Sequence, residues 1–347
     1  MLHNEEIDEE MKILIYTPSF YPNVGGLETV NYLIAQGLAK FFNITVVTPV
    51  INEDEYHEYN FRIVRSASIV TLMREYLKCD VFVHSVLSLK GVLPIMLFPK
   101  KWVVIHHTCY FKVWDKTETL ISHLKKWFTN VSHNICVSDA VGKSLGLKSY
   151  DVIHNSYDSS LFTNYGHSER SGYVFVGRLV TEKGVDVLIE AYRKYCVQSN
   201  RKQKLYIIGD GPMMARYKNV VLEYGLEEMV VFLGQLRGKA LVDELNKRYC
   251  MIVPSRYKEA FGIVALEGLA TGCQLIGSDG DGISEAIGEC GLLFQKGDSH
   301  CLAEKMLQVE NVKSVDKDKA KRHLECFTPE YMVRKYVDYF KQWERKS

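Results

Sequence analysis

The sequence has 347 residues, more than a single hydrophobic core usually organises, so we expect two domains. Its 47% hydrophobic and 24% charged residues are typical of a globular protein. The 43 basic and 42 acidic residues nearly cancel, which argues against a dedicated nucleic-acid-binding protein, because such a protein would have a basic excess.

Residues 1–10 form an acidic leader, MLHNEEIDEE, without the apolar core of an export signal. Short β-rich runs then alternate with helical runs. The first strand is expected at 12–17 (KILIYT) and the first helix at 27–42, followed by strands in NITVVTP, CDVFVHS, KWVVIHH, SHNICVS and YDVIHN. Continuous Val and Ile, rather than strict alternation, indicate strands covered on both faces and therefore a parallel sheet.

A polar segment, 155–172, interrupts this rhythm, and a second β/α series follows. Its expected strands are YVFVGR, KLYIIGDG, MVVFLG, YCMIVPS and CQLIGS, with a helix from Lys183 after the first. The Thr-Pro pair of FTPEYM predicts the start of a last helix. The pattern predicts an α/β protein with two doubly wound parallel-sheet domains, whose ligands bind beyond the carboxyl ends of the strands.

The nine cysteines are scattered and form no C-x-x-C pair. Most lie in apolar runs, where a free thiol behaves as a small hydrophobic residue. We therefore expect a cytoplasmic protein in a reducing compartment. The longest apolar stretch, around GVLPIMLF, is too short to span a bilayer.

In the first domain, Gly25 and Gly26 precede a helix directly after the first strand. Their backbone N–H groups can approach a phosphate at the helix N-terminus, although an ordinary turn would look the same. His106 and His107 end another strand, and alternation places only one of them on the ligand side. That histidine can donate to sugar oxygens or be a core histidine with an internal partner. We find no histidine, cysteine or carboxylate set at the spacing of a metal site.

In the second domain, Arg178 and Lys183 follow one strand, and two cations there suit a pyrophosphate, although a solvated basic edge is the alternative. Glu259 follows another strand, and a helix is expected to begin near Phe261 and Gly262, with N–H groups for the same pyrophosphate. Glu267 lies within that helix among apolar and small residues. A buried carboxylate there needs a partner, so we expect Glu259 to bind a sugar and Glu267 a ribose.

Together these motifs resemble family 4 of the retaining glycosyltransferases. The resemblance rests on GGLE (25–28), VIHNSYDSSLF (152–162), VFVGRLVTEKG (174–184), GDGP (209–212) and EAFGIVALE (259–267), in the family's order over nearly the whole chain. It implies a GT-B fold, in which two Rossmann-like domains face a cleft. It places an acceptor-side domain at 11–160, a nucleotide-sugar-binding domain at 161–326 and a helix that crosses back at 327–347.

The resemblance also implies roles for individual residues. The catalytic set would be Arg178 and Lys183 on the diphosphate, Glu259 on the donor sugar and His107 near the reacting carbon. The remaining substrate contacts would come from Gly25, Gly26, Gly177, Gly211, Phe261, Gly262, Ile263, Val264 and Glu267. Neither a metal nor another cofactor is implied, and the nucleotide-sugar is a co-substrate.

The sequence departs from the family pattern at a few positions. His154 and Ser156 replace the usual Pro and Gly of the linker, Cys109 replaces a common Asp, and Ser284 replaces a common Pro. None of these changes removes a charge from the expected diphosphate site, so we expect an active enzyme.

Other functions fit parts of the sequence. Asp279 and Asp281 form a D-x-D motif after a strand, as in metal-dependent GT-A transferases. A sugar-nucleotide epimerase or a phosphorylase would share the two-domain architecture. A catalytically silent subunit of a glycosylation complex would also share it, but need not keep Arg178, Lys183, Glu259 and Glu267 together.

The segment 116–134 is amphipathic, with hydrophobic residues near one face and basic residues around it. Such a helix can lie on an anionic membrane or pack its apolar face into the core. The hydrophobic set is Leu120, Leu124, Trp127, Phe128 and Val131, and the basic set is His123, Lys125 and Lys126.

The sequence thus predicts a glycosyltransferase of surface polysaccharide or lipopolysaccharide synthesis. It would move a hexose or N-acetylhexosamine from a nucleoside-diphosphate sugar to a glycan or lipid-linked acceptor, with retention and without a metal. A UDP-sugar is the favoured donor and GDP-mannose the second. The protein would be cytoplasmic, with a peripheral position on the inner membrane face as an option.

Overall fold

A computed structural model describes residues 10–23, 25–51, 58–65, 68–108, 120–201, 203–312 and 315–344. The chain divides into two compact units, the first formed by residues 1–154 with 329–347 and the second by residues 155–328. The division falls near the expected boundaries at 160/161 and 326/327. Residues 155–160 belong to the second unit, where the Tyr157 N–H donates to the Phe327 carbonyl at 3.2 Å.

The first unit holds a parallel sheet of seven strands in the order β3-β2-β1-β4-β5-β6-β7 within the described residues. Its registers include Ile13 opposite Ile44 and Val81. Every residue of β4 is buried, as expected for a strand covered on both faces. The strands are β1 (Lys12–Tyr16), β2 (Asn43–Val47), β3 (Arg62–Val64), β4 (Val81–Ser85), β5 (Lys101–His106), β6 (His133–Cys136) and β7 (Asp151–Val152).

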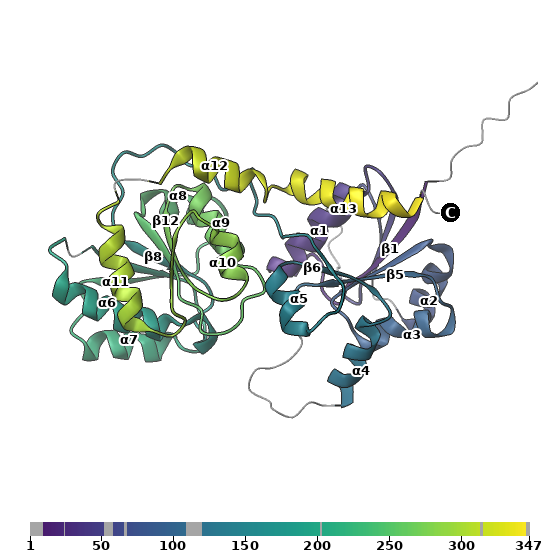
Figure 1. Ribbon diagram of the computed structural model, residues 1–347, viewed down its shortest axis with the longest axis horizontal. Helices are drawn as coiled ribbons and strands as arrows, with labels where there is room; N and C mark the ends of the chain where they lie inside the picture. Colours follow the sequence, from purple (N-terminus) through teal and green to yellow (C-terminus); the bar gives the residue numbers. More distant parts are fainter. Residues whose placement is uncertain are drawn as a thin grey trace, which may run out of the picture. The chain divides into compact units, whose positions relative to one another are not determined.

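Helices cover both faces of this sheet (Figure 1). α2, α3 and α4 pack on one face through Tyr76, Val92 and Phe128. α1 and α13 contact each other on the other face, where the rings of Phe42 and Phe340 lie 6.1 Å apart. The helices are α1 (Gly26–Leu38), α2 (Ile69–Lys78), α3 (Leu89–Leu97), α4 (Leu120–Thr129), α5 (Asp139–Leu145) and α13 (Pro329–Glu344).

The second unit holds a parallel sheet of six strands in the order β10-β9-β8-β11-β12-β13 within the described residues. The strands β8, β9 and β11 consist of hydrophobic residues without polar alternation, which predicts burial on both faces. The strands are β8 (Tyr173–Val176), β9 (Leu205–Ile208), β10 (Val230–Gly234), β11 (Cys250–Val253), β12 (Gln274–Ser278) and β13 (Leu292–Phe294).

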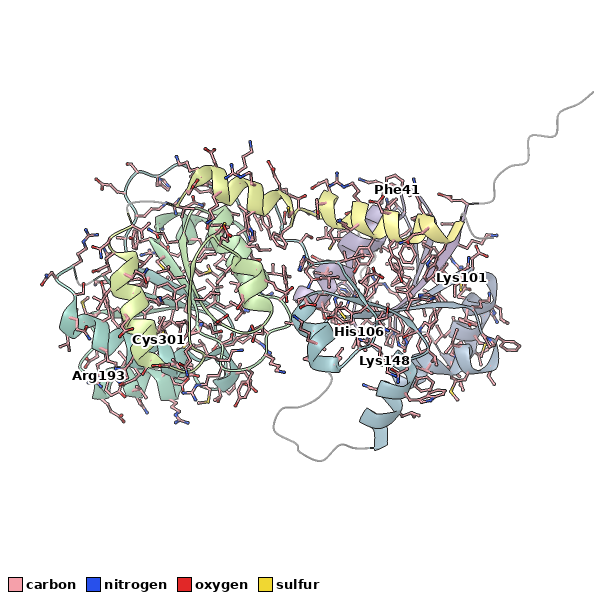
Figure 2. The ribbon with its side chains drawn as sticks, in the orientation of Figure 1. Phe41, Lys101, His106, Lys148, Arg193 and Cys301 are labelled. Atoms are coloured by element: carbon pink, nitrogen blue, oxygen red, sulfur yellow. The ribbon has the colours of Figure 1, made fainter. Side chains whose placement is uncertain are left out.

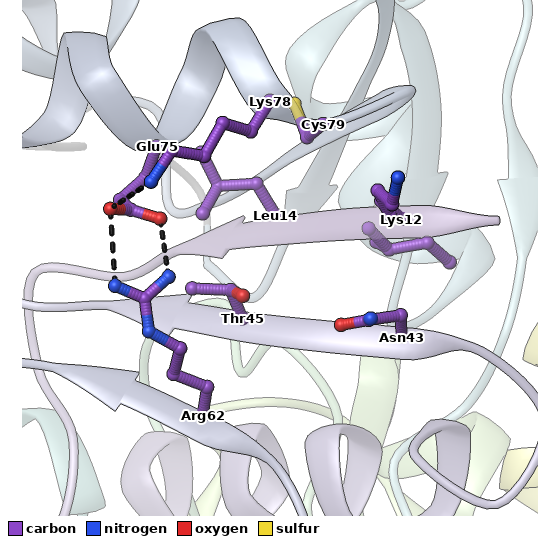
Figure 3. A pocket seen from close by; sticks show the side chains of 9 residues that line it. Lys12, Leu14, Asn43, Thr45, Arg62, Glu75, Lys78 and Cys79 are labelled. Carbon is purple, nitrogen blue, oxygen red and sulfur yellow. Dashed lines mark hydrogen bonds and ion pairs between the residues drawn. The ribbon is translucent and has the colours of Figure 1, made fainter. Parts of the chain in front are cut away.

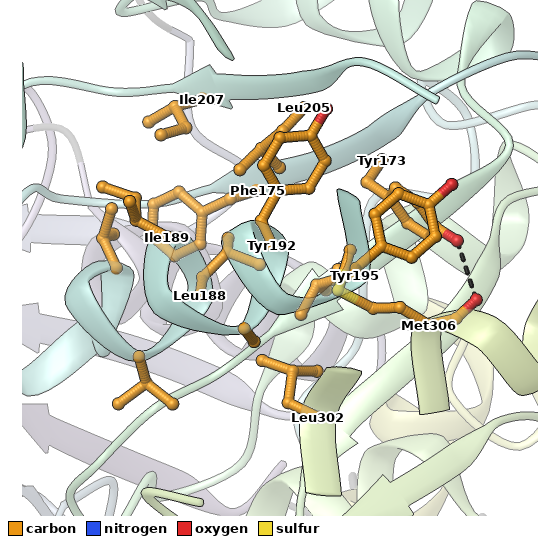
Figure 4. Packing of buried hydrophobic residues seen from close by; sticks show 14 of the residues in the cluster. Tyr173, Phe175, Leu188, Ile189, Tyr192, Tyr195, Leu205, Ile207, Leu302 and Met306 are labelled. Carbon is orange, nitrogen blue, oxygen red and sulfur yellow. Dashed lines mark hydrogen bonds between the residues drawn. The ribbon is translucent and has the colours of Figure 1, made fainter. Parts of the chain in front are cut away.

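A core rich in tyrosine lies between this sheet and α6, α7 and α11 (Figure 4). Tyr173 donates its hydroxyl to the Met306 carbonyl at 2.8 Å, so the polar end of a buried ring is satisfied. α8, α9 and α10 cover the other face. The helices are a 3-10 turn η1 (Thr181–Lys183), α6 (Val185–Gln198), α7 (Met214–Glu223), α8 (Gly238–Lys247), α9 (Ile263–Ala270), α10 (Gly282–Ile287), α11 (Ser299–Val309) and α12 (Lys317–Glu325).

The predicted strands are observed, and two more, β3 and β13, are added at sheet edges. Several helix bounds differ from the predictions, and the amphipathic helix expected over 116–134 ends at Thr129, because β6 begins at His133. α1 ends at Leu38 instead of 42, and the helix expected from Lys183 is the turn η1 followed by α6 from Val185. No helix among the described residues is both long and apolar enough to cross a membrane. The eight cysteines that the structure describes are free thiols.

Candidate functional site

The order of strands in the second sheet defines one crevice. β8 and β11 are neighbours, but the chain leaves β8 toward β9 and leaves β11 toward β12, on opposite sides of this strand pair. Ligands of doubly wound domains bind at such a switch point, beyond the carboxyl ends of the strands. The loops that follow β8 and β11 meet there, and they carry most of the residues singled out in the sequence.

Lys183 and Glu259 form the centre of this crevice. The Lys183 Nζ lies 2.5 Å from the Glu259 Oε1, and the Ser255 hydroxyl donates to the same oxygen at 2.7 Å. The two charged side chains are about a quarter exposed, 27% and 23%, so a ligand can reach them. Burial acts to raise the pKa of Glu259, but the Lys183 ammonium and the two hydrogen bonds lower it below its usual value.

The two loops are clamped together at Gly184. This residue adopts φ +69°, and a Cβ there would lie 2.0 Å from the Pro254 carbonyl oxygen, so only glycine fits. The Arg256 N–H donates to the Glu182 carbonyl at 2.9 Å across the same junction. The clamp brings the loop after β8, which carries Lys183, to the loop that carries Glu259.

Arg178 lies on the same loop as Lys183 but has a different environment. Its side chain is exposed and forms no hydrogen bond or ion pair with any residue that the structure describes. The convergence of Arg178 and Lys183 on one pyrophosphate stays a prediction, because the two side chains share no hydrogen-bond or ion-pair partner among the described residues.

The helix expected near Phe261 begins at Ile263. Gly262 is its N-cap, with φ +108° and no side-chain cap, so the N–H groups of the first turn, which include those of Ile263 and Val264, lack acceptors within the helix. Phe261 itself is buried, with its ring 5.6 Å from that of Phe327. An uncapped helix start next to Lys183 and Glu259 favours an anion at this point.

Glu267 lies one turn further along α9. No group among the described residues donates a hydrogen bond to its carboxyl group. Burial, and then the negative charge of Asp158, raise the pKa of Glu267 to about 7. Glu267 is half-buried, and the partner that we expected for its carboxylate is not supplied by the described part of the chain, in agreement with a ligand hydroxyl as its partner.

The glycine-rich turn after β9 packs against the loop after β8. The Gly177 N–H donates to the Ile208 carbonyl at 3.0 Å, and the Leu179 N–H donates to the Asp210 carbonyl at 2.8 Å. Gly211 follows, with its Cα beside the Leu179 backbone. These contacts place Gly177 and Gly211 beside the crevice, and their predicted contact with substrate stays a prediction.

The first sheet has its own switch point, between β1 and β4. Gly25 and Gly26 follow β1 and begin α1, whose N-cap, Gly25, has no side-chain cap. A Cβ on Gly26 would meet no atom within 4 Å. Packing within the chain therefore does not require glycine at position 26, in agreement with close approach by a ligand.

A chain of hydrogen bonds at the same switch point ends on His107. Thr17 donates its hydroxyl to the Ser19 carbonyl at 2.7 Å, so its oxygen accepts from the Asn31 amide nitrogen at 2.9 Å. The Asn31 amide oxygen then faces Ser85 and accepts its hydroxyl at 2.7 Å. Since Ser85 has used its only proton, it must accept from the His107 Nε2, 3.0 Å away.

This chain assigns the proton of His107 to Nε2 and leaves its Nδ1 as an unprotonated acceptor. The Nδ1 atom is buried and has no hydrogen-bond partner among the described residues. Burial, and then the neighbouring His106, lower the pKa of His107 to about 3, so the imidazole is neutral. His106 instead lies inside the first unit (Figure 2), with its Nε2 2.9 Å from the Asn134 Oδ1.

The D-x-D motif has partners within the protein. Asp279 Oδ1 accepts the Ser284 hydroxyl at 2.9 Å. Asp281 is buried, accepts the Glu259 N–H at 3.1 Å and forms an ion pair with Lys296. No group of three His, Cys, Asp or Glu side chains able to hold a metal ion occurs among the residues that the structure describes.

Sequence reasoning missed the roles of four residues in these networks: Asn31, Ser85, Asp281 and Lys296. Asp281 carried a signal, the D-x-D motif, which we had considered only as the metal motif of the GT-A alternative. Ser85 ends a predicted strand, which would have made it a candidate. Asn31 and Lys296 carried no signal, because their partners are distant in the sequence.

Two cavities lie away from the switch points. One, of about 360 Å³, lies over the amino-terminal part of β1 and β2 (Figure 3), where Arg62 and Lys78 pair with Glu75. The other, of about 770 Å³, borders Gln274 at the start of β12 and Lys321 of α12. Both lie near the amino ends of strands, opposite the edge at which ligands of such sheets bind, so we do not place the functional site in them.

Two Rossmann-like parallel-sheet units, each with its own switch point, define a class of two-domain α/β proteins. Residues 164–323 match the family described as glycosyl transferases group 1. This match lies within the second unit, and together with the glycosyltransferase relatives and the GT-B fold of solved structures it bears out the resemblance to family 4 noted in the sequence.

Curated relatives cover about half of the chain. The uncharacterized glycosyltransferase MJ1178 of Methanocaldococcus jannaschii is 33% identical over 188 residues, which are 53% of this chain and 51% of the relative. The N-acetyl-alpha-D-glucosaminyl L-malate synthase of Bacillus anthracis is 27% identical over 52% of this chain and 47% of its own. The chain thus spans about half the length of these curated relatives.

Solved structures match nearly the whole chain at low identity. Anabaena Alr3699/HepE in complex with UDP has a TM-score of 0.80 and 16% identity and covers 96% of this chain and 100% of its own. The glycosyltransferase from Rickettsia africae ESF-5 has a TM-score of 0.79 and 15% identity and covers 97% and 100%. These likenesses establish the GT-B fold, and the GT-A alternative is therefore wrong.

Proposed function

We propose that this protein is a retaining glycosyltransferase. It moves a hexose or N-acetylhexosamine from a nucleoside-diphosphate sugar to a hydroxyl group of a glycan or lipid-linked acceptor. The observation that carries the proposal is the Lys183–Glu259 pair, 2.5 Å apart beside the uncapped start of α9, at the switch point of the second sheet. A UDP-sugar is the favoured donor, and the HepE chain, of the same fold, is described in complex with UDP and with UDP-glucose.

Each residue of the site has a part in the proposed reaction. The Lys183 ammonium stabilises the diphosphate as its negative charge grows during departure, and Arg178 on the same loop adds a second, solvent-accessible cation. Glu259 accepts hydrogen bonds from the donor sugar, and Glu267 accepts them from the ribose. These are electrostatic and positioning effects, and they require neither a metal nor a covalent enzyme intermediate.

His107 completes the proposed catalytic set. As a neutral imidazole, it can lie near the donor sugar without adding positive charge to the site. Gly25 and Gly26, next to the start of α1, would let the donor phosphate or the acceptor approach the backbone.

Binding and turnover with a panel of donors test this function. UDP-glucose, UDP-N-acetylglucosamine and GDP-mannose are compared by thermal shift and by release of the nucleoside diphosphate, with and without EDTA. We expect one UDP-sugar to stabilise the protein and turn over equally well in EDTA. Stabilisation by nucleotides without any turnover, whatever the acceptor supplied, would favour the silent binding subunit instead.

The Lys183→Ala variant locates the activity at the proposed site. We expect it to lower turnover by roughly 2–4 kcal/mol of transition-state stabilisation, or about 30- to 1,000-fold. Lys204→Ala is the matched control, because Lys204 is an exposed lysine at the amino end of β9, the opposite edge of the same sheet. Turnover within about threefold of wild type in Lys183→Ala would contradict the proposed site.

We also propose that the first unit works at the inner face of the cell membrane, in the synthesis of a surface polysaccharide or lipopolysaccharide. The predicted amphipathic face is corrected in one respect, because Phe128 of α4 packs in the core, 6.1 Å from Trp102. The outward face is nevertheless apolar and continues onto α3, which covers the same side of the sheet (Figure 1). Its exposed residues are Leu93, Met96, Leu97, Phe98, Leu124, Trp127 and Val131.

Charge supports an anionic membrane as the partner of this face. Residues 81–108 and 120–138, which contain both helices, include several lysines, among them Lys90 and Lys125, but no Asp or Glu. Exposed aromatic and aliphatic residues next to lysines are the composition of a surface that binds anionic lipid.

A further inference from the structure

Asp281 lies where three loops of the second unit meet. It follows β12 as the N-cap of α10, and its side chain is only 2% exposed. Its Oδ1 accepts the Ile283 N–H at 3.2 Å, and its Oδ2 accepts the Glu259 N–H at 3.1 Å. The Lys296 ammonium, from the loop after β13, contacts the same Oδ2 and balances the buried charge.

The backbone of Glu259 is held from both sides by this junction. Its N–H donates to Asp281, and its carbonyl accepts the Gly282 N–H at 3.2 Å. A Cβ on Gly282 would lie 2.4 Å from the Ala260 carbonyl oxygen, so the two loops touch at the backbone. Glu259 lies between β11 and α9, outside any helix or strand, and contacts of this kind must therefore define its conformation.

We propose that Asp281, with its charge balanced by Lys296, is a positioning residue that sets the Glu259 carboxylate at Lys183. The inference rests on the proposed function, in which Glu259 binds the donor sugar. It goes beyond that function because it gives both the D-x-D aspartate and Lys296 a role in donor recognition that involves no metal. Asp281 acts only through Glu259 and does not itself touch the substrate.

The D-x-D motif supplies its own control. Asp279 is an exposed aspartate two residues earlier, and it interacts with Ser284 instead of Glu259. Asp281→Asn keeps the volume, and an Asn amide oxygen can still cap α10 at Ile283. Its NH₂ group would then face the Glu259 N–H and the Lys296 ammonium, so the variant removes the contact to Glu259 and spares the cap.

Hydrogen exchange tests the contact without any ligand. In Asp281→Asn we expect the Glu259 amide, followed by mass spectrometry with electron-transfer fragmentation, to exchange about ten- to a hundredfold faster, as for loss of a hydrogen bond to a charged group. Asp279→Asn should leave that rate unchanged, and Lys296→Met should raise it. Thermal unfolding monitors the fold of each variant. An unchanged rate in a folded Asp281→Asn protein would overturn the inference.

Ligand binding tests the consequence. We expect Asp281→Asn to weaken binding of the sugar nucleotide about tenfold or more while affinity for the bare nucleoside diphosphate changes less than about threefold. A general loss of structure would weaken both equally, and that result would overturn the positioning role. If the wild-type protein binds no sugar nucleotide, the proposed function fails, whereas the exchange rates still decide whether Asp281 holds Glu259.

Discussion

Glu259 and Glu267 lie near the same helix start, yet their carboxyl groups differ in ionisation. Lys183 and Ser255 keep Glu259 ionised against the effect of its burial. Glu267 has no such partner among the described residues, and burial next to Asp158 raises its pKa to about 7. The two glutamates therefore differ in what they can offer a ligand, a fixed negative charge at one and a titrating group at the other.

Nucleotide binding should release a proton from Glu267. Ribose hydroxyls that donate to the carboxylate stabilise its ionised form, so binding lowers the pKa and affinity rises with pH until about pH 7. At pH 7 we expect about half a proton to be released per nucleotide. Calorimetry in buffers of different ionisation enthalpy measures it.

Glu267→Gln is the control for this release, because it removes the titrating group and keeps the volume. The difference between wild type and variant isolates Glu267 from the titration of the nucleotide phosphate itself. Equal proton release in the two proteins would refute the ribose role of Glu267.

At the scale of single residues, the sequence predicted what local context can decide. The apolar neighbours of Glu267 predicted a buried carboxylate. Lys183 and Glu259 were identified as site residues because each follows a strand of the same sheet. The residues alone left the choice between His106 and His107 open, and only the family resemblance favoured His107, since the environment of each depends on Asn134 and Ser85 in other strands. The pairing of Asp281 with Lys296 was invisible for the same reason.

At the scale of elements, α4 shows how a helix can have two apolar sides. Phe128 is 3% exposed and belongs to the core, whereas Trp127 is 57% exposed next to it. Periodicity alone grouped the two residues on one face. Packing separates them, because the side toward Trp102 is covered by the core of the first unit, whereas the side that carries Trp127 is largely exposed.

Removing apolar area from α3 and α4 should weaken membrane binding. The double substitution Met96→Ser/Trp127→Ser removes side chains that are 63% and 57% exposed. Each buries up to about 1.5–3 kcal/mol of apolar transfer free energy, so we expect at least about a tenfold loss of binding to anionic vesicles, measured by co-sedimentation.

Leu222→Ser on α7 is the matched control, because Leu222 is 62% exposed in the second unit. Neutral vesicles separate the contribution of lysine charge, and binding to them should be weaker from the outset. If the double variant binds anionic vesicles as tightly as wild type, the α3–α4 face is not the membrane contact.

The helix expected from Lys183 also shows a limit at this scale. The sequence pattern favoured a helix there, but the chain forms the turn η1, and Gly184 then adopts a left-handed backbone conformation before α6 begins. The cause is the Pro254 carbonyl, which approaches Gly184 from the neighbouring strand's loop. A contact made from another element thus decided where the helix starts.

At the scale of the whole molecule, the first unit contains three buried histidines near its switch point. Burial lowers the pKa of His84 and His107 to about 3 and that of His106 to about 4. In the unfolded chain these histidines become protonated below about pH 6.5, whereas in the folded unit they become protonated only near pH 4 and below. Acid therefore favours the unfolded state over this range.

We expect the free energy of unfolding of the first unit to fall as pH drops from 6.5 to 5, by up to about 1.4 kcal/mol per pH unit for each histidine. This window lies above the range in which Glu75 and Asp139, whose pKa values are lowered by Arg62 and Lys143, take up protons. Urea unfolding followed by tryptophan fluorescence measures it, because all four tryptophans belong to the first unit.

His300→Gln serves as the control, since this exposed residue belongs to the second unit. It should leave the pH dependence of the first unit unchanged. A free energy of unfolding that stays constant between pH 6.5 and 5 would show that the three histidines do not carry the effect.

The sequence by itself determined that this protein has two parallel-sheet units, which strand ends carry charged residues, and which motifs give its resemblance to family 4 of the glycosyltransferases. These properties are local, because a short run of consecutive residues is enough to show that a strand is buried on both faces and which residues form the turn after it. Tertiary structure alone decided that Lys183 pairs with Glu259, that Asp281 contacts both Glu259 and Lys296, and that His107 donates to Ser85. Those outcomes depend on the order of strands in each sheet, which brings residues far apart in the chain to within hydrogen-bond distance.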